Sequence, residues 1–415
     1  MELSDDGKKL FTVEASDFTA GSIYIPDSVI SIGVSACEGS ADLTNLTLNN
    51  LKSIGASAFE RCVALETLSV HEVESIGTSA FEGCSSLKTL NLPESVTNLG
   101  AEAFKGCTHL ETAYISANIT SLMVGMFLNC TRLKDLTLPK SIDTIGATAF
   151  KDCISLKTFT APENVTIIGS GAFEGCTALQ RVRLPESVTA IYSGAFENCT
   201  NLRNITLPSN VRDISSCLFK GCTQLKTITL PPYTTSINPL AFEGCIGLKT
   251  ITIPTSLTSI AEDAFKDCQN LTVIIDSDDA SELARISELL PDDVSNRILP
   301  KTLALEINGI IERQLQRITN TPQTNPLYFF RTAAIEKQKR LLPVGLLSNI
   351  NSFLTDENFY HKKAESLITN LPLPKNKVEV IAYEQDIIKI VDAVIHEAKQ
   401  ESTLEKTKLP PSKGM

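Results

Sequence analysis

Cysteine is the residue of this chain with the greatest capacity for chemistry, since a thiolate can bind a metal, form a disulfide or act as a nucleophile. The chain has 12 cysteines among 415 residues. Ten of them recur with a step of 22 and then always 23 residues, and we name them the ladder cysteines: Cys62, Cys84, Cys107, Cys130, Cys153, Cys176, Cys199, Cys222, Cys245 and Cys268.

The spacing of these thiols favours a structural role. It contains no C-x-x-C pair of the kind that binds zinc, and the closest pair includes Cys217, which stands at the turn position that Gly171 holds in another repeat. Stacked thiols could lie close enough to form disulfides, but a chain without a leader is expected to mature in a reducing compartment. No ladder cysteine has a recurring histidine nearby. We expect no metal and no cofactor, and we interpret the ladder cysteines as small buried residues stacked in register.

Other catalytic patterns are incomplete. His396 begins a zincin-like stretch, HEAKQ, but Gln400 stands where the second histidine is required. The acidic stretch 276–282 lacks the spacing of a calcium loop, and we expect Ser277 or Asp278 to cap a helix there. The sequence therefore predicts no enzyme, and an unrecognised site in the helical region is a third hypothesis.

The elements that carry the cysteines are short repeats. Within Leu179-x-x-Val182-x-Leu184-Pro185 the apolar residues alternate as in a strand, which Pro185 should close. We expect a tight turn at Gly194 and at its equivalents Gly100, Gly146 and Gly169. A phenylalanine stands three residues before each ladder cysteine and should fill the outer half of the core: Phe59, Phe81, Phe104, Phe127, Phe150, Phe173, Phe196, Phe219, Phe242 and Phe265.

A period of 22 to 23 residues predicts an α/β fold, a leucine-rich-repeat solenoid with a parallel β-sheet on its concave face. We identify twelve strand segments between residues 22 and 276. In the first repeat Cys37 takes the phenylalanine position and Ser40 the cysteine position, as expected of a terminal repeat. Residues 1–21 should complete an N-terminal cap.

The pattern AFxxCxxLxxIxLPxSVxxIG resembles the BspA-like (Treponema-type) leucine-rich-repeat family over residues 22–276. This resemblance implies protein contacts and adhesion, because family members are commonly surface or secreted proteins of bacteria and protozoa. Repeats joined to a helical region also resemble the secreted effectors of intracellular bacteria such as Legionella.

The charge distribution restricts the partners. The net charge is −11, and residues 1–277 carry −10 of it, so the solenoid should repel nucleic acid. We find no signal peptide and no apolar run near the roughly 20 residues that span a bilayer. We expect a soluble monomer without membrane insertion that binds a protein, including a host protein. It would be cytoplasmic or secreted into a host cell by a type III or type IV route.

The strand positions that point outward form the candidate binding face. Threonine fills most of them, as suits exposed strands. Our candidate partner-binding residues are among the exceptions: Tyr24, Asn91, Tyr114, Asp135, Arg181, Arg183 and Asn204. In the last strand we assign Val273 and Ile275 to this face. A second candidate surface, which a solvated edge would also explain, is a row one residue after each repeat leucine: Lys88, Lys134, Lys157, Arg203, Lys226 and Lys249.

After the repeats the pattern becomes helical. We predict a solenoid over 1–276, a helical bundle over 277–405 whose first part caps the solenoid, and a disordered tail over 406–415. Apolar spacing predicts helices over 302–320 and from Val378 to about Lys406, with three more between them over 327–342, 344–354 and 356–371. The leading functional hypothesis is a non-enzymatic protein-interaction module, a bacterial effector or intracellular adaptor. The alternative is a surface adhesin-like protein.

Overall fold

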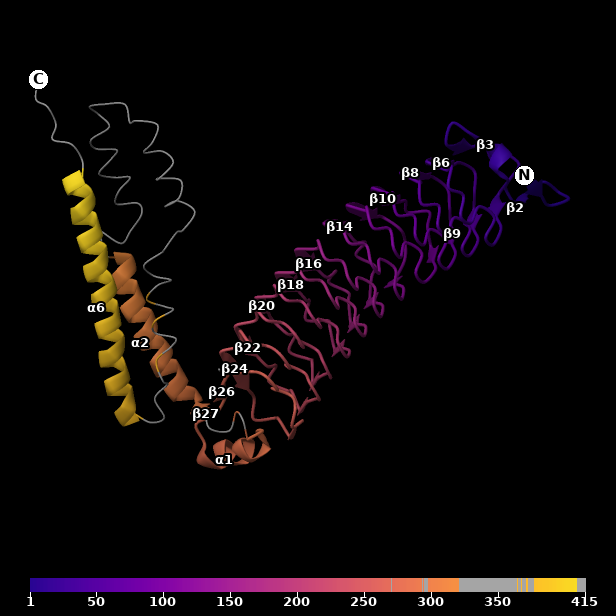
Figure 1. Cartoon of the computed structure of the whole chain (residues 1–415). Coiled ribbons are helices and arrows are strands. Elements are labelled where there is room, and N and C mark those ends of the chain that lie inside the picture. The colour runs from indigo at the N-terminus through magenta and orange to yellow at the C-terminus, as the bar shows by residue number, and fades with distance from the viewer. Residues whose placement is uncertain are drawn as a thin grey trace, which may run out of the picture. The chain divides into compact units, whose positions relative to one another are not determined.

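The computed structural model describes residues 1–269, 271–292, 294, 298–320, 364, 367, 371 and 377–408. The chain forms two compact units, Met1–Ile298 and Leu299–Met415. The first unit is a solenoid of stacked repeats (Figure 1). This confirms the predicted leucine-rich-repeat fold.

The first column of the solenoid consists of twelve strands, as predicted, and where neighbouring strands of this column pair, they pair in parallel. Side chains along these strands alternate between buried and more exposed positions, because successive residues of a strand point to opposite faces, except that Thr272 in the last strand is also buried. The strands are β4 (Ser22–Ile23), β6 (Asn45–Leu48), β8 (Thr67–Val70), β10 (Thr89–Leu92), β12 (Thr112–Ile115), β14 (Asp135–Thr137), β16 (Thr158–Thr160), β18 (Arg181–Arg183), β20 (Asn204–Ile205), β22 (Thr227–Thr229), β24 (Thr250–Ile253) and β26 (Thr272–Ile275).

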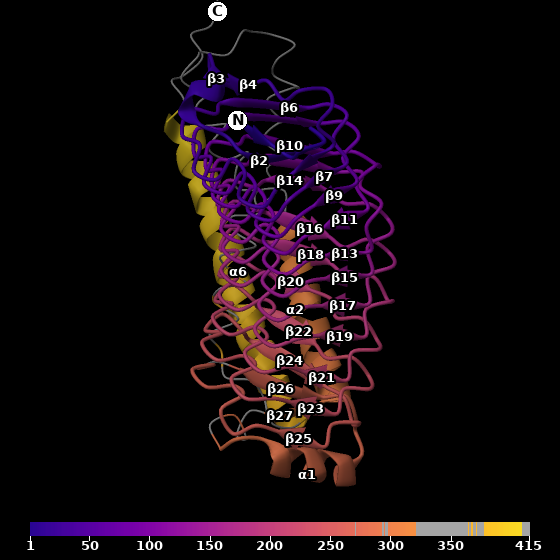
Figure 2. The same ribbon diagram turned by 90° about the vertical axis from the view of Figure 1, so that its right-hand side faces the viewer.

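A second column of two-residue strands lies beside the first (Figure 2). The sequence did not lead us to predict these short strands. The strands are β5 (Ser31–Ile32), β7 (Ser53–Ile54), β9 (Ser75–Ile76), β11 (Asn98–Leu99), β13 (Ser121–Leu122), β15 (Thr144–Ile145), β17 (Ile167–Ile168), β19 (Ala190–Ile191), β21 (Asp213–Ile214), β23 (Ser236–Ile237) and β25 (Ser259–Ile260).

The phenylalanines form one continuous column through the core. All ten are fully buried, and the centroids of successive rings lie between 5.3 and 6.1 Å apart. Such offset stacking adds about 0.5–1.5 kcal/mol per pair to the burial of the rings. Phe159 adds a side contact, tilted against both Phe150 and Phe173.

The ladder cysteines are buried beside this column, as predicted, and all twelve cysteines are free thiols. Each ladder thiol also donates a hydrogen bond to a backbone carbonyl of the preceding repeat, over 3.0 to 3.4 Å. The acceptor is the phenylalanine carbonyl, except that Cys62 donates to the carbonyl of Cys37, which holds the phenylalanine position of the first repeat. Burial raises the pKa of Cys107 to about 12 and also raises the pKa of Cys153. The thiols therefore both fill space and satisfy buried carbonyls.

The glycines that we grouped as one turn position belong to two positions with different causes. Gly194 has φ +66°, a left-handed conformation that glycine adopts without strain. Gly100 and Gly169 serve close packing instead, because a Cβ on Gly100 would lie 2.2 Å from the backbone nitrogen of Thr78 in the previous repeat. Cys217 stands at the left-handed position, with φ 57°.

Both ends of the solenoid are covered. At the N-terminus β2 (Lys9–Thr12) pairs with β5, β1 (Glu2–Leu3) pairs with β2, and β3 (Phe18–Thr19) pairs with β4. These segments lie at the first edge of each column, where an open strand would otherwise invite aggregation.

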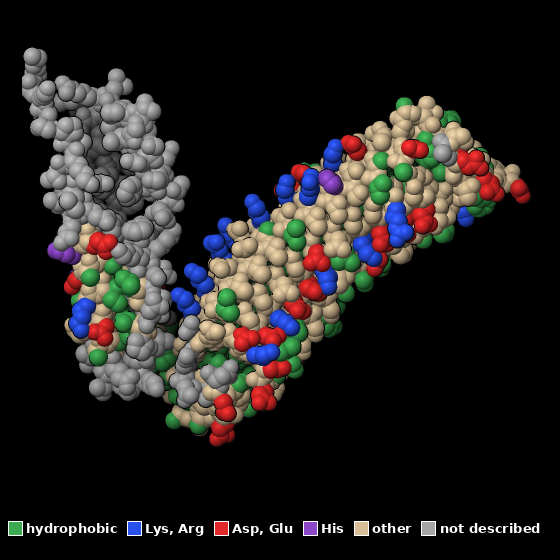
Figure 3. Space-filling view, viewed as in Figure 1, with side chains coloured by type: hydrophobic (Ala, Val, Ile, Leu, Met, Phe, Trp, Pro, Cys, Tyr) green, Lys and Arg blue, Asp and Glu red, His purple; other side chains and the backbone are tan. Residues whose placement is uncertain are grey.

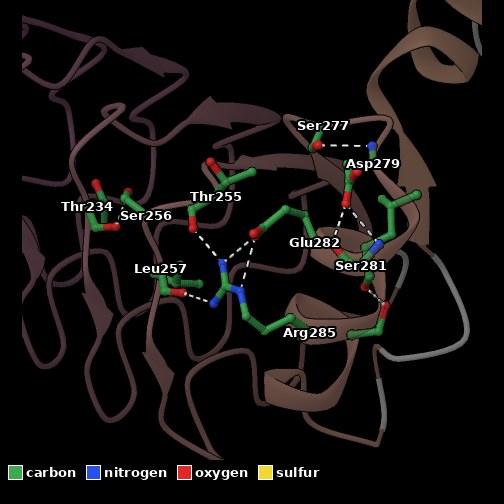
Figure 4. A network of polar contacts seen from close by, with 11 residues as sticks. Thr234, Thr255, Ser256, Leu257, Ser277, Asp279, Ser281, Glu282 and Arg285 are labelled. Carbon is green, nitrogen blue, oxygen red and sulfur yellow. Dashed lines mark hydrogen bonds and ion pairs between the residues drawn. The ribbon is translucent and has the colours of Figure 1, made fainter.

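Helix α1 (Ala280–Leu289) covers the other end, with Ile286 buried in the solenoid core. Its N-cap is Asp279, whose carboxylate accepts from the backbone nitrogens of Ser281 and Glu282, so our assignment of the cap to Ser277 or Asp278 is wrong. Arg285 donates to the carbonyls of Leu257, at 2.7 Å, and Thr255, and it pairs with Glu282 (Figure 4).

The second unit contains α2 (Lys301–Asn320) and α6 (Lys377–Lys408). The two helices contact each other, and Arg317 pairs with Asp392 at 2.7 Å. The division between the units falls within β27 (Ile298–Pro300). Residues 406–408, which we assigned to a disordered tail, are helical. The three predicted helices between 327 and 371 lie outside the described residues, apart from Ala364, Leu367 and Leu371.

Candidate interaction surface

We name the outward side chains of the twelve strands of the first column the sheet face. The predicted aromatic residues are exposed there: Tyr24, directly after β4, is 73% exposed, and Tyr114 on β12 is 48% exposed. Threonine occupies most other positions. The sheet face is therefore a polar surface on a rigid core, with a few side chains that stand out from it.

The first group of predicted residues lies within one hydrogen-bonded sheet, β10-β12-β14. Asn91 is the register partner of Tyr114, and Asp135 is the partner of Thr112. Parallel strands lie about 4.8 Å apart, so these side chains are immediate neighbours. Tyr24 is separated from them by β6 and β8.

The second group lies in the next sheet, β16-β18-β20. Arg181 and Arg183 point outward from β18, and Asn204 on β20 is the register partner of Arg181. On the other side they border Thr158 and Thr160 of β16. Only β16 separates this cationic group from the group around Tyr114.

The assignment of Val273 and Ile275 to the sheet face is wrong, since both are fully buried. The last strand starts one residue earlier after its cysteine, and Thr272 and Ile274 align with Thr250 and Thr252 of β24. Because the side-chain period of a strand is two, this shift of one residue exchanges the two faces.

Two of the six edge cations form ion pairs with neighbouring glutamates. Lys88 pairs with Glu66 at 2.6 Å, and Lys134 pairs with Glu111 at 3.3 Å. We did not predict these partners from the sequence, although each glutamate holds the same position one repeat earlier. The remaining cations of the row are exposed and form no ion pair with any described carboxylate: Lys157, Arg203, Lys226 and Lys249. Figure 3 shows Lys and Arg side chains in a row along one edge of the solenoid.

On the turns next to the phenylalanines the charges are paired. Lys151 contacts Glu174 at 2.8 Å, and Glu243 lies between Lys266, at 2.8 Å, and Lys220, at 3.0 Å. These two lysines hold the pKa of Glu243 below its usual range. Charges on this side of the solenoid are thus largely neutralised within the chain.

Sites for catalysis are not apparent in the described part of the chain. No three or more of its His, Cys, Asp and Glu side chains are arranged to hold a metal ion. A hollow of about 490 Å³ near the N-terminal cap has Asp42 as its only titratable lining residue. The helices described here include none that is long and apolar enough to cross a bilayer.

Comparison with known structures finds similar solenoids in bacteria. A leucine-rich cell surface protein of Faecalibacterium prausnitzii is 29% identical, with a TM-score of 0.44, and the match covers 64% of this chain and 81% of that one. The pneumococcal vaccine antigen PcpA is 22% identical with a TM-score of 0.51, covering 71% and 84%. A leucine-rich repeat protein of Bacteroides ovatus is 24% identical with a TM-score of 0.40, covering 66% and 87%. No curated protein matches the sequence.

The model of the BspA-type leucine-rich repeat region matches six copies, over residues 15–122, 52–176 and 144–272. These ranges span more than half of the chain and coincide with the solenoid. The predicted resemblance is confirmed, and the chain belongs to the BspA-type leucine-rich repeat family.

Proposed function

We propose that this chain is a non-enzymatic protein-interaction module that binds its partner on the sheet face. The observation that carries the proposal is the exposed group Arg181, Arg183 and Asn204, placed together on β18 and β20 of a rigid solenoid. Arginine and tyrosine are the residues that most often dominate binding energy at protein interfaces. Asn91, Tyr114 and Asp135 lie on the other side of β16 and extend the same surface.

A capture experiment with the full chain tests this proposal. The Arg181→Glu/Arg183→Glu variant should lose the proteins that the unchanged chain captures, whereas Lys140→Glu/Arg212→Glu should retain them. The control residues are also exposed, but they lie outside the sheet face. Equal capture by both variants would remove this face from the proposal.

We further propose a role as a bacterial effector or intracellular adaptor that acts as a monomer and has a host protein among its partners. The support is the state of the thiols: all twelve cysteines are free, which suits a reducing compartment. A translocation reporter fused to the chain should give signal inside host cells.

The second candidate is an adhesin-like surface protein, favoured by membership of the BspA-type family. In that case the chain should remain on intact bacteria and disappear when they are treated with an external protease. The two measurements give opposite results for the two roles.

A further inference from the structure

The half of the sheet face nearest α1 carries cations without carboxylates. From β16 to β24 the outward positions hold Arg181 and Arg183 together with threonines and Asn204, and none holds Asp or Glu. The neighbouring edge adds four more cations and one neutral residue: Lys157, Gln180, Arg203, Lys226 and Lys249. We name the six cations of this region the basic strip.

The basic strip is unusual within this molecule. Residues 1–277 have a balance of −10, and the edge lysines nearer the N-terminus, Lys88 and Lys134, are paired with glutamates. The edge cations of the strip have no such partner among the described residues. Unit charges about 5 Å apart in water repel by about 0.8 kcal/mol, a cost that an anionic partner would relieve.

The spacing of the strip indicates what kind of anion fits. Lys157, Arg203 and Lys249 lie two repeats apart from each other, which corresponds to about 9.6 Å between successive members. A polyproline-II segment presents the same face every three residues, after about 9.3 Å. Carboxylates at every third residue of such a segment would therefore meet one edge cation after another.

We propose that the basic strip binds an acidic, extended segment of a protein partner, in polyproline-II conformation, with Asp or Glu at every third position. This inference rests on the proposed function and specifies the chemistry of the partner. The sheet-face arginines flank the same path, and guanidinium groups bind carboxylates through two parallel hydrogen bonds.

Fluorescence anisotropy with the full chain tests this directly. The probe is a fluorescein-labelled (Glu-Pro-Pro)6 peptide. Its controls are (Gln-Pro-Pro)6 and (Glu-Glu-Pro-Pro-Pro-Pro)3, which has the composition of the probe but a different spacing. We expect the probe to bind most tightly, with an affinity that falls as salt is added.

Charge reversal locates the binding. The variant Lys157→Glu/Arg203→Glu/Lys249→Glu should weaken the probe about tenfold or more, since close charge pairs at interfaces contribute strongly. The variant Lys52→Glu/Lys88→Glu/Lys134→Glu changes net charge equally at paired lysines and should stay within about twofold. Unchanged melting temperatures would establish that both variants fold.

Equal weakening by both variants, or equal binding of the two acidic peptides, would overturn the inference. Tight binding of heparin without binding of the probe would also overturn it and would assign the strip to a sulfated polysaccharide. If the probe fails while capture still depends on Arg181 and Arg183, this inference falls and the proposed function stands.

Discussion

Glu197 and Glu243 hold the same position two repeats apart, yet their surroundings are opposite. Burial, followed by the nearby Glu174, raises the pKa of Glu197, whereas Lys266 and Lys220 lower that of Glu243. A raised carboxyl pKa means that the charged form costs stability at neutral pH. A lowered pKa means that the charged form stabilises the fold above about pH 4.5 and that this stabilisation is lost as the pH falls.

We therefore expect Glu197→Gln to increase the free energy of unfolding at pH 7 and Glu243→Gln to decrease it, each by less than about 1 kcal/mol. Both differences should shrink as the pH is lowered and the carboxyl groups of the unchanged protein become protonated. Urea unfolding of the three proteins at pH 7 and at pH 3 measures the differences. Shifts of the same sign at pH 7 would contradict this account.

The ladder thiols provide a second comparison between residues. Cys153 is fully buried and donates to the carbonyl of Phe127 at 3.2 Å, whereas Cys217 is half-buried and its thiol has no such bond. We expect Cys153→Ala to cost about 1–3 kcal/mol through the cavity and the lost hydrogen bond. Cys217→Ala should change stability by less than about 0.5 kcal/mol.

Denaturant unfolding measures both variants, and thiol labelling of the native protein gives an independent readout. Iodoacetamide should modify the half-buried Cys217, while Cys107 and Cys153 should react only after unfolding, since burial raises the pKa of both thiols. Rapid native labelling of Cys153 would show that the ladder is open to solvent.

The side chain of Arg285 attaches helix α1 to the last repeats of the solenoid. Arg285 joins it to the carbonyls of Leu257 and Thr255, while Glu288 on the same helix is exposed. We expect Arg285→Ala to destabilise the solenoid by about 1–3 kcal/mol, because two backbone carbonyls lose a charged donor. Glu288→Ala serves as the matched control.

Hydrogen exchange is the informative measurement for these two variants. In Arg285→Ala the amides of α1 and of β24 and β26 should exchange faster, with less change toward the N-terminus. An effect spread evenly along the solenoid, or an equal effect of Glu288→Ala, would contradict the assignment of α1 as a cap.

For helices and strands, the sequence predicted which elements form better than it predicted where they begin. The 23-residue period was sufficient for the twelve strands and the buried thiols, because packing side chains must recur where repeats stack. It did not predict the cap at Asp279, where three successive candidates compete, or the register of β26, where the repeat is one residue shorter. The hydrogen bonds from the thiols to backbone carbonyls were also not predicted, since every residue type has the same carbonyl and the sequence does not distinguish one acceptor from another.

The candidate surface was predicted only as a set of outward positions. Lys88 is neutralised by its ion pair with Glu66, whereas other cations of the same row remain available to a partner. The position of a residue within the repeat does not reveal this difference. The adjacency of Asn204 and Arg181 followed directly from the period.

For the whole molecule, the phenylalanine column makes stability depend on position along the solenoid. Phe150 stacks on Phe127 and Phe173 and contacts Phe159, whereas Phe265, among the residues that the structure describes, stacks only on Phe242. We expect Phe150→Ala to cost about 3–5 kcal/mol and Phe265→Ala to cost less. Urea unfolding provides the measurement, and equal losses would argue against stacking between neighbours as the source of stability.

The bond from each ladder thiol to the carbonyl one repeat earlier has an evolutionary consequence. In every interior repeat the phenylalanine carbonyl accepts from the thiol of the next repeat, and the cysteine thiol donates to the carbonyl of the previous repeat. The joint between two neighbouring repeats, meaning this hydrogen-bonded contact, is therefore interchangeable along the solenoid. Gene duplication or loss of one whole unit would recreate an identical joint at the new boundary. The length of such a chain is thus free to change in steps of one unit while its interior stays the same.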